Sequence, residues 1–200
     1  MVEYKTGPAR MLMWVDAVGG FMVCLDDEIV LGRPSPDSAA DVAIMADLSR
    51  RHAVIYRDGE GYLIEPLQHV ALDGRPLAEV TPLADGNIIQ LGPSVELRFR
   101  RPHALSATAR LEMLSHHRTE PAADAVLMMA ESCVLGPAWN SHVVCRDWRE
   151  EVILFRHGSE LCCRTRGRFE VDGRPSDRSC AIRAGSHVAG DYFSFTLEAA

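Results

Sequence analysis

Two short clusters in the first third of the chain carry the side chains best suited to hold a phosphate: Gly32-Arg33 and Ser49-Arg50-Arg51-His52. A phosphate has nearly two negative charges and strong acceptor oxygens. The Arg33 guanidinium can donate charge-assisted hydrogen bonds, and its charge does not titrate away. Ser49 offers a short hydroxyl donor, and Arg50 a second cation. These residue types predict an anion site on neighbouring loops, provided that the fold brings the two clusters together.

Composition predicts a globular protein with a packed core, because 47% of the 200 residues are hydrophobic and 24% are charged. The net charge of −7 argues against a nucleic-acid-binding protein, which normally needs a broad basic surface. The N-terminus does not read as a signal peptide, and no segment approaches the ~20 apolar residues that span a bilayer. We expect a cytoplasmic protein without nucleic-acid or membrane partners.

The six cysteines are scattered along the chain and form no Cys-x-x-Cys pair, so they predict buried small side chains and no metal site. Cys162 and Cys163 are adjacent, and adjacent residues of a strand face opposite sides. The histidines His116, His117 and His142 have no partner at a metal-ligand spacing. The sequence therefore predicts neither a metal nor another cofactor.

The same skeleton occurs twice, at a spacing of about 100 residues, which indicates a duplication. Several segments match in the same order, with offsets that drift by a few residues: Ala9–Met13 with Ala109–Met113, Val30–Pro34 with Val134–Pro137, Asp47-Leu48 with Asp147-Trp148, and Leu72–Pro76 with Val171–Pro175. We expect two domains, 1–102 and 103–200, with the boundary near 102–108 and a long loop at 115–125.

Each half is rich in short runs of branched residues separated by turn signals, which favours an all-β fold built from two tandem β-sandwiches. In the first half these runs are 42–45, 53–56, 62–64 and 88–91. Asp58–Gly61, Asp73-Gly74 and His157-Gly158 are typical of hairpin turns. A helix is conceivable only at 107–116, and the repeat indicates that this segment is also a strand.

The first half resembles a forkhead-associated (FHA) domain over roughly residues 9–101. The resemblance rests on the order and spacing of short motifs: Gly32-Arg33, Asp41–Ile44, Ser49–Ala53, Leu72-Asp73-Gly74 and Leu83…Gly86–Gly92. It implies a non-catalytic β-sandwich of the FHA/SMAD-like type that recognises phosphothreonine on partner proteins in intracellular signalling. The partner would be a Thr-phosphorylated protein, such as a Ser/Thr kinase or its substrate, and a homodimer is left open.

The resemblance also suggests roles for individual residues. Arg33, Ser49 and Arg50 would contact the phosphopeptide, whereas Gly32 and His52 would support the site. The family usually has an Asn-Gly-Thr stretch whose Asn grips the peptide backbone, but this chain has Leu67-Gln68-His69-Val70 there. Gln68 can replace the amide at longer reach, with more side-chain entropy to lose on binding.

The second half lacks the phosphate-binding groups and is therefore expected to be a degenerate FHA-like repeat. Pro137 stands in place of Arg33, and Arg149-Glu150-Glu151 replaces the serine cluster with two carboxylates that would repel a phosphate. We expect this half to stabilise the first half or to contact proteins. Trp139, Trp148 and Phe155 are expected to be core or packing residues rather than a recognition surface, with a paired domain interface as the alternative.

Two alternatives belong to other classes. In a scaffold or oligomerisation protein neither repeat would bind phosphate, and Arg33 would then pair with Asp37 or Asp41. A hydrolase using Ser49 and His52 is disfavoured, because residues three apart on a strand face opposite sides. The chain also has no Gly-x-Ser-x-Gly elbow, no Walker loop and no His-Glu-x-x-His helix.

Overall fold

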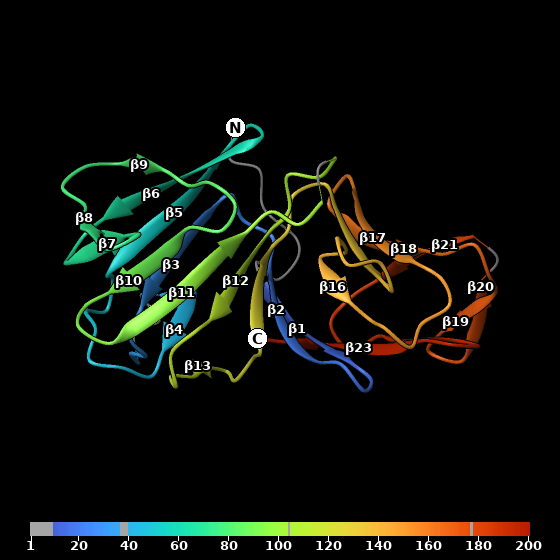
Figure 1. The fold of residues 1–200 in the computed structure, drawn as a ribbon. Helices are drawn as coiled ribbons and strands as arrows, with labels where there is room; N and C mark the ends of the chain where they lie inside the picture. Colours follow the sequence, from blue (N-terminus) through green and yellow to red (C-terminus); the bar gives the residue numbers. More distant parts are fainter. Residues whose placement is uncertain (1–9, 37–39, 104, 177) are drawn as a thin grey trace, which may run out of the picture.

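The computed structural model describes residues 10–36, 40–103, 105–176 and 178–200, and these residues form strands and loops without a helix (Figure 1). The all-β prediction is thereby confirmed. In the described part of the chain, no helix is present that could cross a membrane.

The first half contains β1 to β11, in order Arg10–Val15, Gly19–Cys24, Glu28–Gly32, Val42–Ile44, Ala53–Asp58, Gly61–Pro66, Val70–Leu72, Arg75–Pro76, Thr81–Pro82, Ile88–Leu91 and Val95–Arg100. The second half contains β12 to β23, in order Ala109–Met113, Thr119–Glu120, Ala125–Met128, Ser132–Gly136, Val143–Val144, Val152–His157, Glu160–Arg164, Phe169–Val171, Arg174–Ser176, Ser179–Ile182, His187–Gly190 and Ser194–Ala199. The segment at 107–116 contains a strand, β12, as the repeat indicated.

The predicted hairpin turns form because their residues tolerate a left-handed backbone. Asp73 and Gly74 have φ values of 50° and 77°, and they join β7 to β8. Gly59, with φ 57°, lies in the turn between β5 and β6. The second half repeats the first of these turns, with φ values of 54° and 73° at Asp172 and Gly173. Glycine and aspartate reach this region at low steric cost, so the turn prediction is confirmed.

Strand pairing follows one scheme in both halves. β3 pairs in parallel with β4 and antiparallel with β5, and β15 pairs in the same way with β16 and β17. The pairs β5–β6, β7–β8 and β10–β11 likewise have the counterparts β17–β18, β19–β20 and β22–β23. This agreement supports the duplication that we propose from the sequence.

The two halves exchange their first hairpins. The β1–β2 hairpin of the first half pairs with β23, the last strand of the second half, whereas β12 of the second half pairs with β11 of the first. β2 and β14 pair in parallel, and this pairing joins strands of both halves into one twelve-stranded sheet. The strand order of this sheet is β20-β19-β22-β23-β1-β2-β14-β12-β11-β10-β7-β8. Figure 1 shows this sheet running through the middle of the molecule.

Two hydrophobic cores lie on opposite faces of the central strands. Along β2, Phe21 and Val23 belong to the core of the second half, and the alternate residues Met22 and Cys24 belong to the core of the first half. Successive side chains of a strand point to opposite faces, so the central strands are buried on both sides. The six-stranded sheet β13-β4-β3-β5-β6-β9 covers one core, and the five-stranded sheet β16-β15-β17-β18-β21 covers the other. The domain boundary at 102/103 stays a prediction. Each of the two cores contains residues from both 1–102 and 103–200.

Two local expectations need correction. The expected loop at 115–125 contains a short strand, β13, because the backbone of Thr119–Glu120 completes the open edge of β4. Trp139 is not a core residue: 84% of it is exposed, whereas Trp148 is buried against Phe193 with ring centroids 5.4 Å apart. The loop after β15 carries Trp139 away from the sandwich, a displacement that residue type alone does not indicate.

Candidate functional site

Arg33 lies directly after β3, at the start of the loop that leads to β4. Its backbone N–H donates a 3.0 Å hydrogen bond to the carbonyl of Ser49, and its side chain is exposed. The structure therefore brings the two sequence clusters together through their backbones. Ser49 is half-buried and Arg50 exposed in the loop between β4 and β5.

Gly32 permits this contact because it has no side chain. A Cβ atom at Gly32 would lie 2.1 Å from the carbonyl oxygen of Arg50 and 2.9 Å from that of Ser49. Backbone atoms cannot move aside as the end of a flexible side chain can. The supporting role expected for Gly32 thus has a physical cause, which is close backbone approach; a left-handed φ is not required.

His52 connects the serine loop to the loop between β6 and β7. Its buried ring accepts a 3.2 Å hydrogen bond at Nδ1 from the Ser49 N–H, so Nε2 carries the proton that is donated to the carbonyl of His69 at 2.9 Å. The His52 carbonyl also accepts the N–H groups of Leu67 and Gln68, at 3.1 and 3.0 Å. This places the exposed Gln68 on a loop that is fixed relative to Ser49.

The hydrogen bonds of His52 also bear on the hydrolase alternative. The ring nitrogen that faces Ser49 is bonded to the backbone N–H of that residue. The structure records no bond from this ring to the Ser49 hydroxyl, which a nucleophile–base pair requires. The geometry therefore supports a bracing role for His52.

A cavity of about 420 Å³ adjoins Arg33. Arg10 and Glu120 line it together with Arg33, and neither belongs to the two phosphate-binding clusters of the sequence. Arg10 Nη1 donates to the carbonyls of Ala40 and Asp41 at 3.3 and 2.5 Å. Only the tertiary fold reveals these two residues, because both come from segments distant in sequence from β3.

The scaffold alternative predicts that Arg33 pairs with an acidic side chain, either Asp37 or Asp41. The Asp41 carboxylate accepts the N–H of Val30 at 2.8 Å, and no ion pair between it and Arg33 is present among the described residues. Asp37 lies outside the described residues. Arg33 is thus exposed beside Ser49 and is not held by Asp41, as a phosphate site requires.

The corresponding loops of the second half are braced by a carboxylate instead of a histidine. Glu150 Oε2 accepts hydrogen bonds from the Thr165 hydroxyl at 2.8 Å and from the Gly167 N–H at 2.9 Å. Pro137, in the position of Arg33, is exposed. The fold keeps the connection between these loops, but a carboxylate makes it here and an imidazole makes it in the first half.

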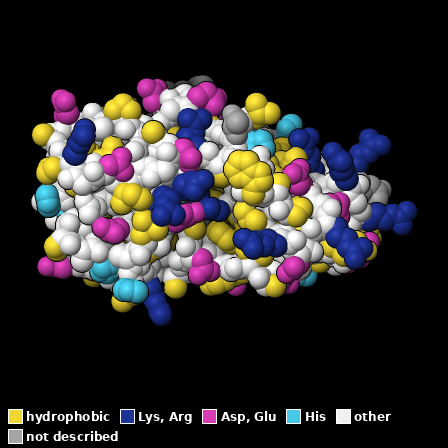
Figure 2. Space-filling view, viewed as in Figure 1, with side chains coloured by type: hydrophobic (Ala, Val, Ile, Leu, Met, Phe, Trp, Pro, Cys, Tyr) yellow, Lys and Arg dark blue, Asp and Glu magenta, His cyan; other side chains and the backbone are white. Residues whose placement is uncertain are grey.

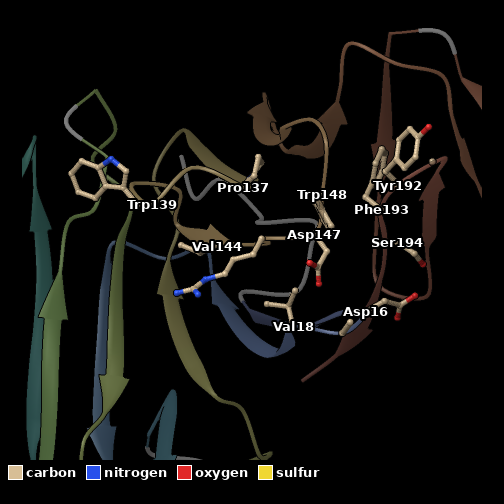
Figure 3. Close-up of a pocket in the computed structure, with 13 residues that line it drawn as sticks. Asp16, Val18, Pro137, Trp139, Val144, Asp147, Trp148, Tyr192, Phe193 and Ser194 are labelled. Carbon is tan, nitrogen blue, oxygen red and sulfur yellow. The ribbon is translucent and has the colours of Figure 1, made fainter.

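Aromatic side chains gather beside Pro137 at this end of the second half, together with the charged residues Arg146 and Asp147 (Figure 3). An open pocket of about 1030 Å³ is lined by Val18, Pro137, Trp139, Trp148 and Tyr192, among others. The Arg149 guanidinium carbon lies 4.1 Å from the centre of the Tyr192 ring, at the distance of a cation–π contact. This arginine is therefore engaged by a ring.

Exposed arginines gather around β19, β20 and β21, at the far end of the molecule in Figure 2. Those described there are Arg164, Arg166, Arg168, Arg174, Arg178 and Arg183. The remainder of the chain must be correspondingly more acidic, because the net charge is −7.

The cysteines are buried as expected, except for Cys180, which is half-buried. Burial raises the pKa of the Cys24, Cys133, Cys145 and Cys163 thiols to about 12. Such thiols stay protonated at neutral pH and are poor nucleophiles. The described residues contain no cluster of side chains that could hold a metal ion.

The FHA domain family model matches residues 29–92, which include Arg33, Ser49, Arg50, His52 and Gln68. No curated protein sequence matches the chain. The chain is similar to the solved FHA domain of the CT664 protein from Chlamydia trachomatis, with 26% identity over 42% of this chain and 89% of that one, and a TM-score of 0.33.

Two further solved structures are similar. One is the FhaA FHA domain complexed with the intracellular domain of Rv3910, with 26% identity over 41% of this chain and 91% of that one, and a TM-score of 0.31. The other is the N-terminal FHA domain of EssC, a component of the bacterial type VII secretion apparatus, with 10% identity over 94% and 92% and a TM-score of 0.26. From the family match and the loop geometry together, residues 29–92 of this chain form an FHA domain.

Proposed function

We propose that the FHA domain binds phosphothreonine segments of partner proteins, with Arg33, Ser49, Arg50 and Gln68 as the contacting residues. One observation carries the proposal: the Arg33 and Ser49 loops are bonded directly, and His52 ties the Ser49 loop to the Gln68 loop. Three loops that carry donor side chains thus form one rigid group. A rigid group of donors binds an anion at a lower entropic cost than separate flexible loops would.

Each residue has a distinct role in this proposal. The Arg33 guanidinium donates to the phosphate, and the Ser49 hydroxyl donates a second hydrogen bond. Arg50 adds positive charge on the same loop. The Gln68 amide contacts the backbone of the bound segment in this proposal. The partner is a protein phosphorylated on threonine, such as a Ser/Thr kinase or its substrate, and the binding serves signalling without catalysis.

The second half supports the first in this proposal. It supplies β12 and β14 to the twelve-stranded sheet, and Val126 and Met128 of β14 belong to the first-half core. Because Pro137 and Glu150 replace the phosphate-binding groups, we expect no phosphate binding there. This matches a degenerate repeat whose retained role is structural.

The test is a titration of the full chain with a library of fluorescent phosphothreonine peptides and the matching unphosphorylated set. We expect phosphate-dependent binding that Arg33→Ala weakens by at least about tenfold, the loss of one charged hydrogen bond. Arg149→Ala is the matched control at the aligned serine loop of the second half and leaves binding unchanged. Equal affinity for both peptide sets, or full affinity in Arg33→Ala, would contradict the proposal.

The scaffold alternative is favoured by one observation, the exposed Trp139 at a pocket that Trp148 and Tyr192 also line. Such a surface suits contact with a protein better than contact with a phosphate. If no peptide binds in a phosphate-dependent way, the scaffold alternative is favoured. In that case neither half of the chain binds phosphate.

A further inference from the structure

A segment of the second half lies against the FHA domain at the edge next to Arg33. Within the 114–124 connection, β13 pairs with β4, and the N–H of Met45 donates a 2.8 Å hydrogen bond to the carbonyl of Arg118. The Thr119 hydroxyl donates to the Pro121 carbonyl at 2.8 Å and accepts the Ala123 N–H at 2.9 Å. These bonds make the segment a fixed part of the first-half sheet.

Glu120 stands in one row with Gly32 across this sheet. It is paired with Ala43 on β4, and Ala43 is paired with Gly32 on β3. Neighbouring strands lie 4.7–4.9 Å apart, so the Cα atoms of Glu120 and Gly32 are separated by about 10 Å. Residues paired across adjacent strands point to the same face of the sheet.

The face shared by this row is the one crossed by the serine loop. A side chain at Gly32 would run into the carbonyl oxygens of Ser49 and Arg50, so that loop lies over Gly32 on this side. Ala43 is small and leaves space beside it. In agreement, Glu120 and Arg33 line the same cavity of about 420 Å³.

The carboxylate of Glu120 adds negative charge to an otherwise cationic wall. Glu120 is exposed, and no ion pair of its side chain is present among the described residues. Arg10, the other cation of the cavity, already donates to two backbone carbonyls. Because the Debye length is about 8 Å in physiological salt, a carboxylate here acts on side chains that enter the cavity.

We propose that Glu120 gives the FHA domain a preference for phosphothreonine segments with a basic residue where the segment passes over β4, and a bias against an acidic one there. A lysine or arginine at that point pairs with Glu120, whereas an aspartate or glutamate is repelled. The second half thereby sets the partner selectivity of the first. This inference rests on the proposed phosphothreonine binding.

The test uses the full chain and one phosphothreonine peptide scaffold with alanine at the flanking positions. A single lysine or a single glutamate is placed in turn at each position on both sides of the phosphothreonine, and affinities are measured by fluorescence anisotropy. We expect one side of the peptide to favour lysine over glutamate by about threefold to tenfold, the scale of an exposed charge pair. Glu120→Gln brings this ratio close to one, and Glu120→Lys reverses it.

Glu170→Gln is the matched control, because Glu170 is an exposed strand glutamate on β19 of the second half. It leaves the lysine-to-glutamate ratio as in the unmodified chain. Thermal unfolding of each variant checks that the fold is intact, which we expect for substitutions at exposed side chains.

The outcomes separate this inference from the proposed function. Peptide binding can depend on Arg33 while Glu120→Gln keeps the charge preference of the unmodified chain. This result overturns the role of Glu120 and leaves the proposed phosphothreonine binding in place. A lysine-to-glutamate affinity ratio close to one at every peptide position in the unmodified chain also overturns the role of Glu120. If no peptide binds in a phosphate-dependent way, both the site and its selectivity are overturned.

Discussion

Asp124 and Gly20 bond to each other twice across the junction between the two halves. The Asp124 carboxylate accepts the N–H of Gly20 at 2.8 Å, and the Asp124 N–H donates to the Gly20 carbonyl at 2.7 Å. Both residues stand at the beginning of the parallel pair formed by β2 and β14. This pair fixes the exchange of hairpins, because it holds the first hairpin of each half beside that of the other.

The exchange predicts that the two repeats do not fold separately as stable monomers. A fragment of residues 1–102 retains β1 and β2 without their partners β23 and β14, and it leaves β11 without β12. Unpaired strand edges and uncovered apolar faces favour association or unfolding. We expect the fragment to unfold or to form a strand-exchanged dimer, as measured by circular dichroism and light scattering. A monomer with the thermal stability of the full chain would contradict the exchanged arrangement.

A pair of glycines provides a test of the loop geometry. In Gly32→Ala the new Cβ meets the Arg50 carbonyl, so the serine loop must move, and we expect a loss of about 1–3 kcal/mol in stability with weaker phosphopeptide binding. In Gly136→Ala, the equivalent change, the nearest atom is the Cγ of Glu151 at 2.8 Å, which is part of a flexible side chain. We expect a smaller loss there and unchanged phosphopeptide binding, as measured by urea unfolding and anisotropy. Equal effects of the two substitutions would contradict this account.

His142 predicts how stability depends on pH. Burial, with repulsion from His103 and Arg110, lowers the pKa of His142 from 6.5 to about 4. The unfolded chain then binds a proton between these values that the native protein does not, so stability falls as the pH falls through this window. The stabilising contribution is complete only above the unfolded pKa, and we expect a loss of about 2 kcal/mol between about pH 7 and pH 5.

Urea unfolding at the two pH values measures this loss. His142→Gln should reduce the difference, because the titrating group is removed from its buried place beside the His103 ring. His157→Gln, a change of an exposed histidine, serves as the control and leaves the difference in place. An unchanged pH dependence in His142→Gln would assign the loss to other groups.

Much of the fold is local in origin and could be predicted. The turns at Asp58–Gly61 and Asp73-Gly74 depend on residues that tolerate a left-handed backbone, and the strands between them consist of branched residues. The proximity of Arg33 and Ser49 was predictable too, because the spacing of their motifs resembled a known family, which the family match at 29–92 confirms. The exposure of Trp139 was not predictable, because it depends on the path of one loop.

The sequence by itself determined the all-β fold, the repeated order of strands and the residues suited to hold a phosphate, since these follow from local patterns and side-chain chemistry. Only the tertiary structure decided which hairpin completes which sandwich. β2 and β14 are apolar and buried on both faces, so their local pattern does not indicate which sandwich each one completes. That choice is seen only in the strand pairing, above all in the parallel pair of β2 with β14. The same pairing carries the 114–124 segment to the FHA domain and places Glu120 beside Arg33, a proximity between distant segments that no local pattern encodes.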